Sequence, residues 1–139
     1  MPVLTIRKSL ESDGNNHTTD ITSQVVHALT ETAIESGIVT IFVTGSTAGI
    51  TTIEFEPGCV HDLSAAFDRL FPKDLRYLHH ERWGDDNGHS HTRAAMLGPS
   101  LTVPFEQGQL LLGTWQQIIL VDFDTRPRTR NYVVQIVGE

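Results

Sequence analysis

Alternation between apolar and polar residues opens the chain and predicts that it begins with a strand. Val3 to Arg7 alternate as a half-buried strand does, and Thr18–Ile21 forms a candidate return strand after the turn at Asp13–Asn16. Further along, two short runs rich in β-branched and aromatic residues lie at Ile38–Val43 and Ile50–Phe55. These runs predict two buried strands in the first half of the chain.

Two stretches with a period near 3.6 residues predict the main helices. The first carries an apolar stripe that ends before Gly37, and the second carries one that ends before Pro72. The residues of the two stripes are Val25, Leu29 and Ala33, and Val60, Leu63, Phe67 and Leu70.

The last third of the chain predicts four more strands joined by short turns. Gly108 lies at the bend of a hairpin between Leu101–Phe105 and Gln109–Leu112, and apolar strands follow at Ile118–Phe123 and Tyr132–Val137. Consecutive strands with short turns favour antiparallel pairing. With two main helices and about seven strands, and with no repeat or linker, the chain is predicted to be one α+β domain over residues 1–139.

The composition limits which partners and which cellular compartment we expect for this protein. The chain is 39% hydrophobic and 19% charged, which is enough for a packed core, and its net charge of −7 argues against nucleic acid and anionic membranes. No apolar stretch approaches the ~20 residues that cross a bilayer, and no signal-peptide pattern opens the chain. The single cysteine, Cys59, fits a reducing compartment. We therefore expect a cytoplasmic protein that acts on small molecules.

Four of the seven histidines lie between residues 79 and 91, in a polar and turn-rich segment. On an extended approach strand, Tyr77 and His79 share one face and His80 points the other way. No other stretch is so rich in groups that bind metals or move protons near neutral pH. The alternative is that these are surface or capping histidines in a solvated loop.

The exit from this segment resembles a helix that begins at Asp86-Asn87. On such a helix Asn87 and His91 are one turn apart, whereas His89 faces away by roughly 200°. We therefore expect His79 and His91 to converge with Asp86 and Asn87. Two imidazoles with a carboxylate are donors that a divalent metal accepts, although their spacing is not a known zinc signature.

Four further features carry both a functional and a structural interpretation. Glu54 lies in an apolar strand, where it serves a ligand or faces water at an edge. Cys59, beside a helix start, is a thiol of lowered pKa or a small packing residue. Trp115 belongs to the core or to an interface, and the neighbouring Gln116 has a polar side chain that could extend into a pocket. Three arginines alternate at Arg126, Arg128 and Arg130. On an extended chain they share one face and clamp a phosphate, or they form a charged turn without a function.

Several of these motifs together resemble the YjbQ family, also called the secondary thiamine-phosphate synthase enzymes. The resemblance runs from about residue 18 to the end of the chain. In chain order the motifs are Ser46–Glu54, Tyr77-Leu78-His79, Asp86-Asn87 with His91, Gly108, Gly113-Thr114-Trp115-Gln116, Phe123-Asp124 and Pro127–Arg130. The glycine turn before Gly-Thr-Trp-Gln and the Asp-Asn step to His91 are the most specific of them. Many members of the family have a histidine at the position of Ser46.

The resemblance implies a homotrimer with a β-sandwich-like core and a polar pocket between subunits. It points to Glu54, His79, Asp86, Asn87, His91, Gln116 and Arg130 as pocket residues. From these we assign candidate roles. The candidate catalytic residues are His79, His91, Glu54 and Asn87; the candidate ligands of a Mg²⁺ or Zn²⁺ ion are His79, His91 and Asp86; the candidate phosphate-binding residues are Gln116, Arg128 and Arg130.

Two hypotheses of function follow from the resemblance. The first is a metal-assisted transferase that joins a pyrimidine pyrophosphate to a thiazole phosphate, as a thiamine-phosphate synthase does. The second is a non-catalytic trimer that binds a metal or a small phosphorylated metabolite. Turnover separates the two, because both predict ligand binding.

Overall fold

Eight strands and four helices make up the protein in a computed structural model that describes residues 1–139. The strands are β1 (Val3–Ser12), β2 (His17–Asp20), β3 (Gly37–Val43), β4 (Ala48–Ile53), β5 (Ser100–Glu106), β6 (Gln109–Leu110), β7 (Gln117–Asp122) and β8 (Arg128–Gly138). The helices are α1 (Thr22–Thr30), α2 (Pro57–Leu70), α3 (Leu78–Trp83) and α4 (Gly88–Leu97).

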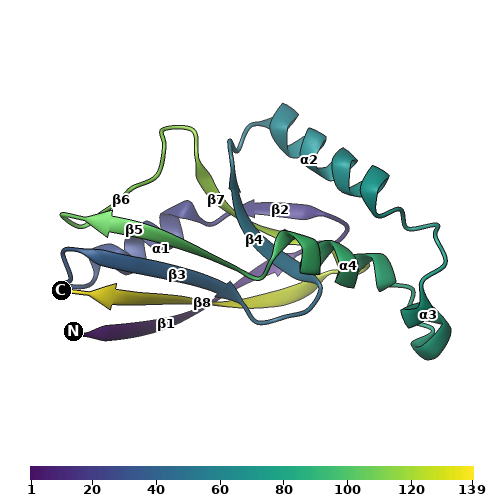
Figure 1. Ribbon diagram of the computed structural model, residues 1–139, viewed down its shortest axis with the longest axis horizontal. Coiled ribbons are helices and arrows are strands. Elements are labelled where there is room, and N and C mark those ends of the chain that lie inside the picture. The colour runs from purple at the N-terminus through teal and green to yellow at the C-terminus, as the bar shows by residue number, and fades with distance from the viewer.

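The strands form two antiparallel sheets. The larger sheet has the order β1-β8-β3-β5-β6, and the smaller has the order β2-β7-β4 (Figure 1). Every paired ladder is antiparallel, which agrees with the short turns between the late strands. The predicted α+β class with an antiparallel, sandwich-like core is therefore confirmed, with eight strands where about seven were expected.

The central strand β7 is buried on both faces, and this defines the layers of the fold. Ile118 and Leu120 face the main core, which they share with residues of the larger sheet and of α1. Ile119, Val121 and Phe123 face a second core built with α2 and α4. The smaller sheet is thus the middle layer between the larger sheet and these two helices.

The first helix is shorter than its apolar stripe predicts. It ends at Thr30, before Ala33. The Thr32 hydroxyl donates to the Leu29 carbonyl at 3.0 Å and accepts from the Ile34 amide at 3.2 Å. Because a threonine side chain offers the backbone these alternative partners, the helix stops here.

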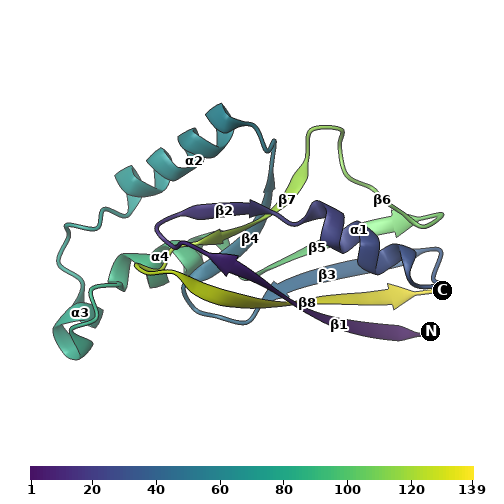
Figure 2. The ribbon, with the colours of Figure 1, turned by 180° about the vertical axis from the view of Figure 1, so that it is seen from behind.

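Helices α2, α3 and α4 gather at one end of the molecule, and the two termini lie at the other (Figures 1 and 2). Tyr77 has extended backbone, but Leu78–Trp83 form a helix that ends at Gly84, whose φ of 68° is left-handed. The extended geometry expected for His79 and His80 is therefore wrong. None of the four helices combines the length and the apolar character needed to cross a membrane.

Candidate functional site

Helix α4 begins where the sequence predicts and presents Asn87 and His91 on the same side. Asn87 is the N-cap residue, yet its side chain makes no capping hydrogen bond to the helix. The backbone carbonyl of Asn87 instead accepts from the amides of Ser90 and His91 at 3.0 and 3.3 Å. The Asn87 amide group is therefore free to contact the residues across the site.

His79 and His91 converge, as their spacing predicts. Their ring centroids lie 4.5 Å apart and the rings meet edge to face at 64°. His79 Nε2 lies 3.2 Å from Oδ2 of Asp85. The Asn87 amide has two orientations: in one its nitrogen donates to Asp124, and in the other the nitrogen lies 3.1 Å from both Asp85 Oδ1 and His79 Nε2. Two imidazoles, a carboxylate and a carboxamide thus meet at one end of the molecule.

The acidic partner of His79 is Asp85, and the expectation that it would be Asp86 is wrong. Asp86 has a φ of 57°, so the chain reverses there and its carboxylate turns away. Its amide donates to Nδ1 of His80 at 2.9 Å, and its side chain is 82% exposed. Since His79 and His80 are neighbours on a short helix, each takes a different one of the two aspartates.

A close backbone approach holds α3 against α4. A Cβ atom added to Gly88 would lie 2.4 Å from Cβ of Tyr77, so only glycine fits at this contact. The Tyr77 hydroxyl donates to the Pro72 carbonyl at 2.8 Å and anchors the start of α3. Tyr77 therefore fixes where His79 lies relative to His91.

The donor set around His79 fits a divalent metal in part. Two ligands about 2.0–2.1 Å from a tetrahedral ion lie about 3.3 Å apart, and His79 Nε2 and Asp85 Oδ2 are 3.2 Å apart. The ligand atoms of His79, His91 and Asp85 are not all within 4.8 Å of one another in the single chain. His91 therefore has to turn its ring, or another donor has to join, to complete a metal shell.

His91 also lines a cavity of about 340 Å³ beside this group. The other lining residues are Gly45, Ser46, Ala48, Ala94, Ala95 and Pro99. Ser46, which belongs to the first of the motifs that carry the resemblance, faces the same cavity as His91. The cavity wall is made mainly of small side chains, so it gives access to the imidazole of His91.

A buried ion pair lies directly behind the histidine pair. Arg130 on β8 donates through Nε and Nη2 to the two carboxylate oxygens of Asp122 on β7, at 2.8 and 2.7 Å. The two side chains are 3% and 0% exposed. Because Arg130 is buried and its Nε and Nη2 are taken by Asp122, in the single chain it holds an internal ion pair and does not present these nitrogens to a phosphate as expected.

Asp124 links this ion pair to the histidine site, and sequence spacing gave no reason to select it. Its carboxylate accepts from Thr47 at 3.1 Å and from Arg128 at 3.2 Å, and it accepts from Asn87 at 3.4 Å when that amide is turned away from His79. Arg128 is 49% exposed at its side chain. Of the predicted clamp, Arg128 and the exposed Arg126 therefore remain accessible to an anionic ligand, and Arg128 is the one that contacts Asp124.

The pKa values of Asp122 and Asp124 both lie below the ordinary value. Burial alone would raise both pKa values, but hydrogen bonds to the charged carboxylates outweigh it. Asp122 accepts from Arg130 and from the Asp124 amide. Asp124 accepts from the Thr125 amide, Asn87 and Thr47. Such groups stabilise the fold fully above the unfolded-state pKa of about 3.9, and the contribution is lost as pH falls through the lower folded-state pKa.

We therefore expect the midpoint of urea unfolding to stay level down to about pH 5 and to fall steeply below about pH 4. The measurement is a series of urea titrations between pH 2.5 and pH 7. Asp124→Asn removes one of the two carboxylates, so its midpoint should fall less over the acid range. A wild-type midpoint that stays constant down to pH 2.5 would show that these carboxylates do not support the fold.

Glu54 and Gln116 lie at the opposite end of the smaller sheet. Glu54 follows the end of β4, where Ile53 pairs with Gln117 at the start of β7. Gln116 donates to the Thr52 hydroxyl at 3.1 Å and accepts from the Gly113 amide at 3.0 Å. Asp122, which holds Arg130, is five residues beyond Gln117 along β7, about 17 Å from it at about 3.3 Å per residue. One chain therefore does not bring all the candidate residues together.

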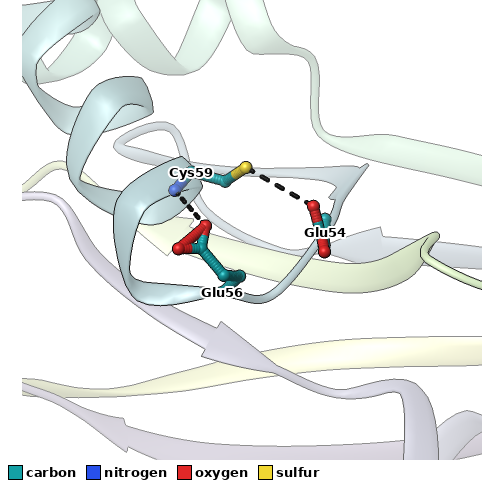
Figure 3. A group of neighbouring side chains, drawn as sticks. All are labelled: Glu54, Glu56 and Cys59. Carbon is teal, nitrogen blue, oxygen red and sulfur yellow. Dashed lines mark hydrogen bonds between the residues drawn. The ribbon is translucent and has the colours of Figure 1, made fainter.

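Glu54 belongs to a small exposed group with Glu56 and Cys59 (Figure 3), whose ligand atoms all lie within 4.8 Å of one another. Glu56 caps α2, since its two carboxylate oxygens accept from the Gly58 and Cys59 amides at 2.7 and 2.8 Å. The hydrogen bond with Glu56, together with some burial and the charge of Glu54, raises the pKa of the Cys59 thiol. The interpretation of Cys59 as an activated thiol is therefore wrong.

The fold and the histidine group define a class: a two-sheet α+β protein with an imidazole-bearing polar site at one end of its middle layer. A family model described as UPF0047 protein YjbQ-like matches residues 7–139. The chain therefore belongs to the YjbQ-like UPF0047 family, as its motifs indicate.

Relatives and solved structures agree with this assignment. The chain is 36% identical to a UPF0047 protein of Methanocaldococcus jannaschii over 121 residues. This matched region covers 86% of this chain and 84% of the relative. It is 37% identical over 120 residues to the UPF0047 protein YugU of Bacillus subtilis, covering 86% and 88%. A crystal structure of a YbjQ-like protein from Sulfolobus solfataricus P2 matches with a TM-score of 0.89 and 31% identity, covering 99% of this chain and 100% of that chain.

Proposed function

We propose that this protein is a metal-assisted transferase of the thiamine-phosphate-synthase kind. It would join a pyrimidine pyrophosphate to a thiazole phosphate and release pyrophosphate. The observation that carries the proposal is the convergence of His79 and His91 with Asp85 and Asn87, in a chain of the YjbQ-like family. Two imidazoles beside a carboxylate are suited both to holding a divalent ion and to moving a proton near neutral pH.

Each residue of the site has a role that follows from its contacts. His79 and Asp85 would hold a Mg²⁺ or Zn²⁺ ion, which when bound supplies positive charge to a leaving pyrophosphate. His91, which lines the adjacent cavity, is placed to give a proton to or take one from a bound substrate. Asn87 orients Asp85 by donating to its carboxylate when its amide is turned toward it, and the half-exposed Arg128 is placed to bind a phosphate oxygen.

The division of the candidate residues between two ends of the smaller sheet supports a homotrimer. Gln116 lies on the same exposed connection as Leu111 and Trp115, whose exposed fractions are 52% and 70%. Exposed aromatic residues of this size are typical of protein interfaces. We propose that this connection, with Glu54, completes the His79 site of a neighbouring subunit. Light scattering is then expected to give the mass of three chains, and a stable monomer would contradict this arrangement.

The test of the function is turnover by purified protein supplied with both precursors. With Mg²⁺ or Zn²⁺ present, thiamine phosphate and pyrophosphate are expected to appear in equal amounts, and removal of the metal with a chelator should abolish both. Chromatography of the products with a coupled pyrophosphate assay measures them. If the precursors or other phosphates raise the melting temperature of the protein but no product forms, the result would instead support the non-catalytic binding protein.

A further inference from the structure

Helix α4 has a second polar face, turned away from the histidine site. His89 and Arg93 are one turn apart on it, and they are 3% and 2% exposed. They line a cavity of about 340 Å³ with residues from the turn after β1, from α2 and from the connection after α2. That volume is at the lower end of ordinary small-molecule pockets, which begin at roughly 300 Å³.

The walls of this cavity are fixed by hydrogen bonds before any ligand enters. Arg93 donates to the Phe71 carbonyl at 3.1 and 2.7 Å and to the Asn16 side-chain oxygen at 2.8 Å, and pairs with Asp68 at 3.1 Å. Asn16 in turn donates to the Ser64 hydroxyl at 2.9 Å. The Ser64 hydroxyl proton is left free for another acceptor.

His89, which lines this cavity, has a ring nitrogen that no group of the protein uses. Its single hydrogen bond joins Nε2 to the Ser90 hydroxyl at 3.4 Å. Ser90 gives its own proton to the Phe123 carbonyl, so Nε2 is the donor and Nδ1 is a free acceptor. No fully enclosed side-chain polar atom of the protein lacks a hydrogen bond, so Nδ1 is not sealed in the core.

The charges around the cavity favour an anion. Arg93 and Lys73 both line the cavity and bring positive charge to it. The Asp68 carboxylate is already paired with Arg93. Lys73 is exposed at the rim and makes no ion pair, so its charge is free to attract a ligand.

We propose that this cavity is a second ligand site that binds a hydrogen phosphate group, either free or as the protonated end of a phosphomonoester. Its P–O–H donates to Nδ1 of His89, while its charged oxygens accept from Lys73 and the Ser64 hydroxyl. A carboxylate or a sulfate carries no proton at neutral pH and leaves Nδ1 without a donor. The site is separate from the His79 site and does not depend on the proposed transferase activity.

The experiment titrates the protein at pH 7 and constant ionic strength with inorganic phosphate, sulfate, acetate and glycerol phosphate. Calorimetry gives each affinity, and the ¹⁵N signals of the imidazole rings show which histidine responds. We expect phosphate to shift the His89 signals and to bind about tenfold more tightly than sulfate or acetate, the value of one added hydrogen bond. A glycerol phosphate affinity at or above that of phosphate identifies a phosphomonoester as the ligand, and a lower one identifies free phosphate.

The chain offers a matched control because it has just two lysines. Lys73→Ala is expected to weaken phosphate binding at His89 about five- to tenfold, while Lys8→Ala, with the same loss of charge on β1, leaves it unchanged. Lys73 is exposed and unpaired, so its removal does not endanger the fold. Equal binding of sulfate and phosphate, equal effects of the two lysine variants, or unmoved His89 signals would each overturn the proposal. A response confined to His79 and His91 would overturn it while leaving the transferase proposal standing.

Discussion

Replacing Arg130 with methionine is expected to destabilise the protein by about 3–5 kcal/mol, because it leaves the carboxylate of Asp122 buried without its partner. Asp122 is 0% exposed and receives two of its hydrogen bonds from Arg130. Thr47 also loses its contact with the guanidinium. The measurement is urea unfolding, where a lower midpoint at an unchanged slope reports lost stability rather than a changed unfolded state.

Arg128→Met is the matched control for this variant. It removes the same side chain two residues earlier on β8, but Arg128 is 49% exposed and its ion pair with Asp124 is worth about 0–1 kcal/mol. Asp122→Asn combined with Arg130→Met should recover part of the loss, since the uncompensated charge is then absent. Similar losses for Arg130→Met and Arg128→Met would show that the buried ion pair does not hold the fold.

This ion pair also explains how the site keeps its shape. Arg130 lies on β8 of the larger sheet, and Asp122 lies on β7 of the smaller one, so the pair joins the two sheets. Asp124, two residues beyond Asp122, then reaches Asn87 at the start of α4. The contacts therefore run from the core to the start of α4, which is why a residue expected to bind phosphate instead supports this helix from behind.

The strands could be predicted because their apolar patterns match the layer in which each strand lies. The run at Ile118–Phe123 is apolar at every position but Asp122, and β7 is buried on both faces in the middle layer. The start of α4 could also be predicted, from the Asp-Asn pair before a helical stretch. Asn87 and His91 lie on the same side of α4 because they are four residues apart, close to one turn of a helix.

Helix α3 could not be predicted in the same way. It has six residues and buries none of them, so it carries no apolar stripe to detect. The choice between Asp85 and Asp86 depends on the left-handed backbone of Asp86, which spacing does not reveal. Arg128 and Arg130 do share a face, as alternation predicts, but that face meets Asp122 and Asp124, which lie at the end of the preceding strand in the other sheet. The partner of a charged residue is set by tertiary packing, and one sequence does not state it.

Replacing His91 with alanine is expected to lower kcat/KM for thiamine phosphate formation by about 10²–10⁴-fold, the usual range for loss of a group that transfers protons. His91 makes no side-chain hydrogen bond in the chain, and its ring contacts the ring of His79 and lines the cavity beside it. The fold should therefore persist, and circular dichroism with urea unfolding verifies this. Metal bound per chain, measured after dialysis against Zn²⁺, should fall as well if His91 completes the shell around His79.

His80→Ala is the control, because it removes an imidazole from the same segment without touching the site. His80 faces Asp86, and its ring accepts from the Asp86 amide, away from His79 and His91. Its loss should change kcat/KM by less than about threefold, which corresponds to about 0.7 kcal/mol of the activation barrier. If His91→Ala and His80→Ala reduce the rate equally, the histidine pair has no special part in the reaction. If His91→Ala binds less metal but turns over at the wild-type rate, His91 is a ligand and the proton must move through another group.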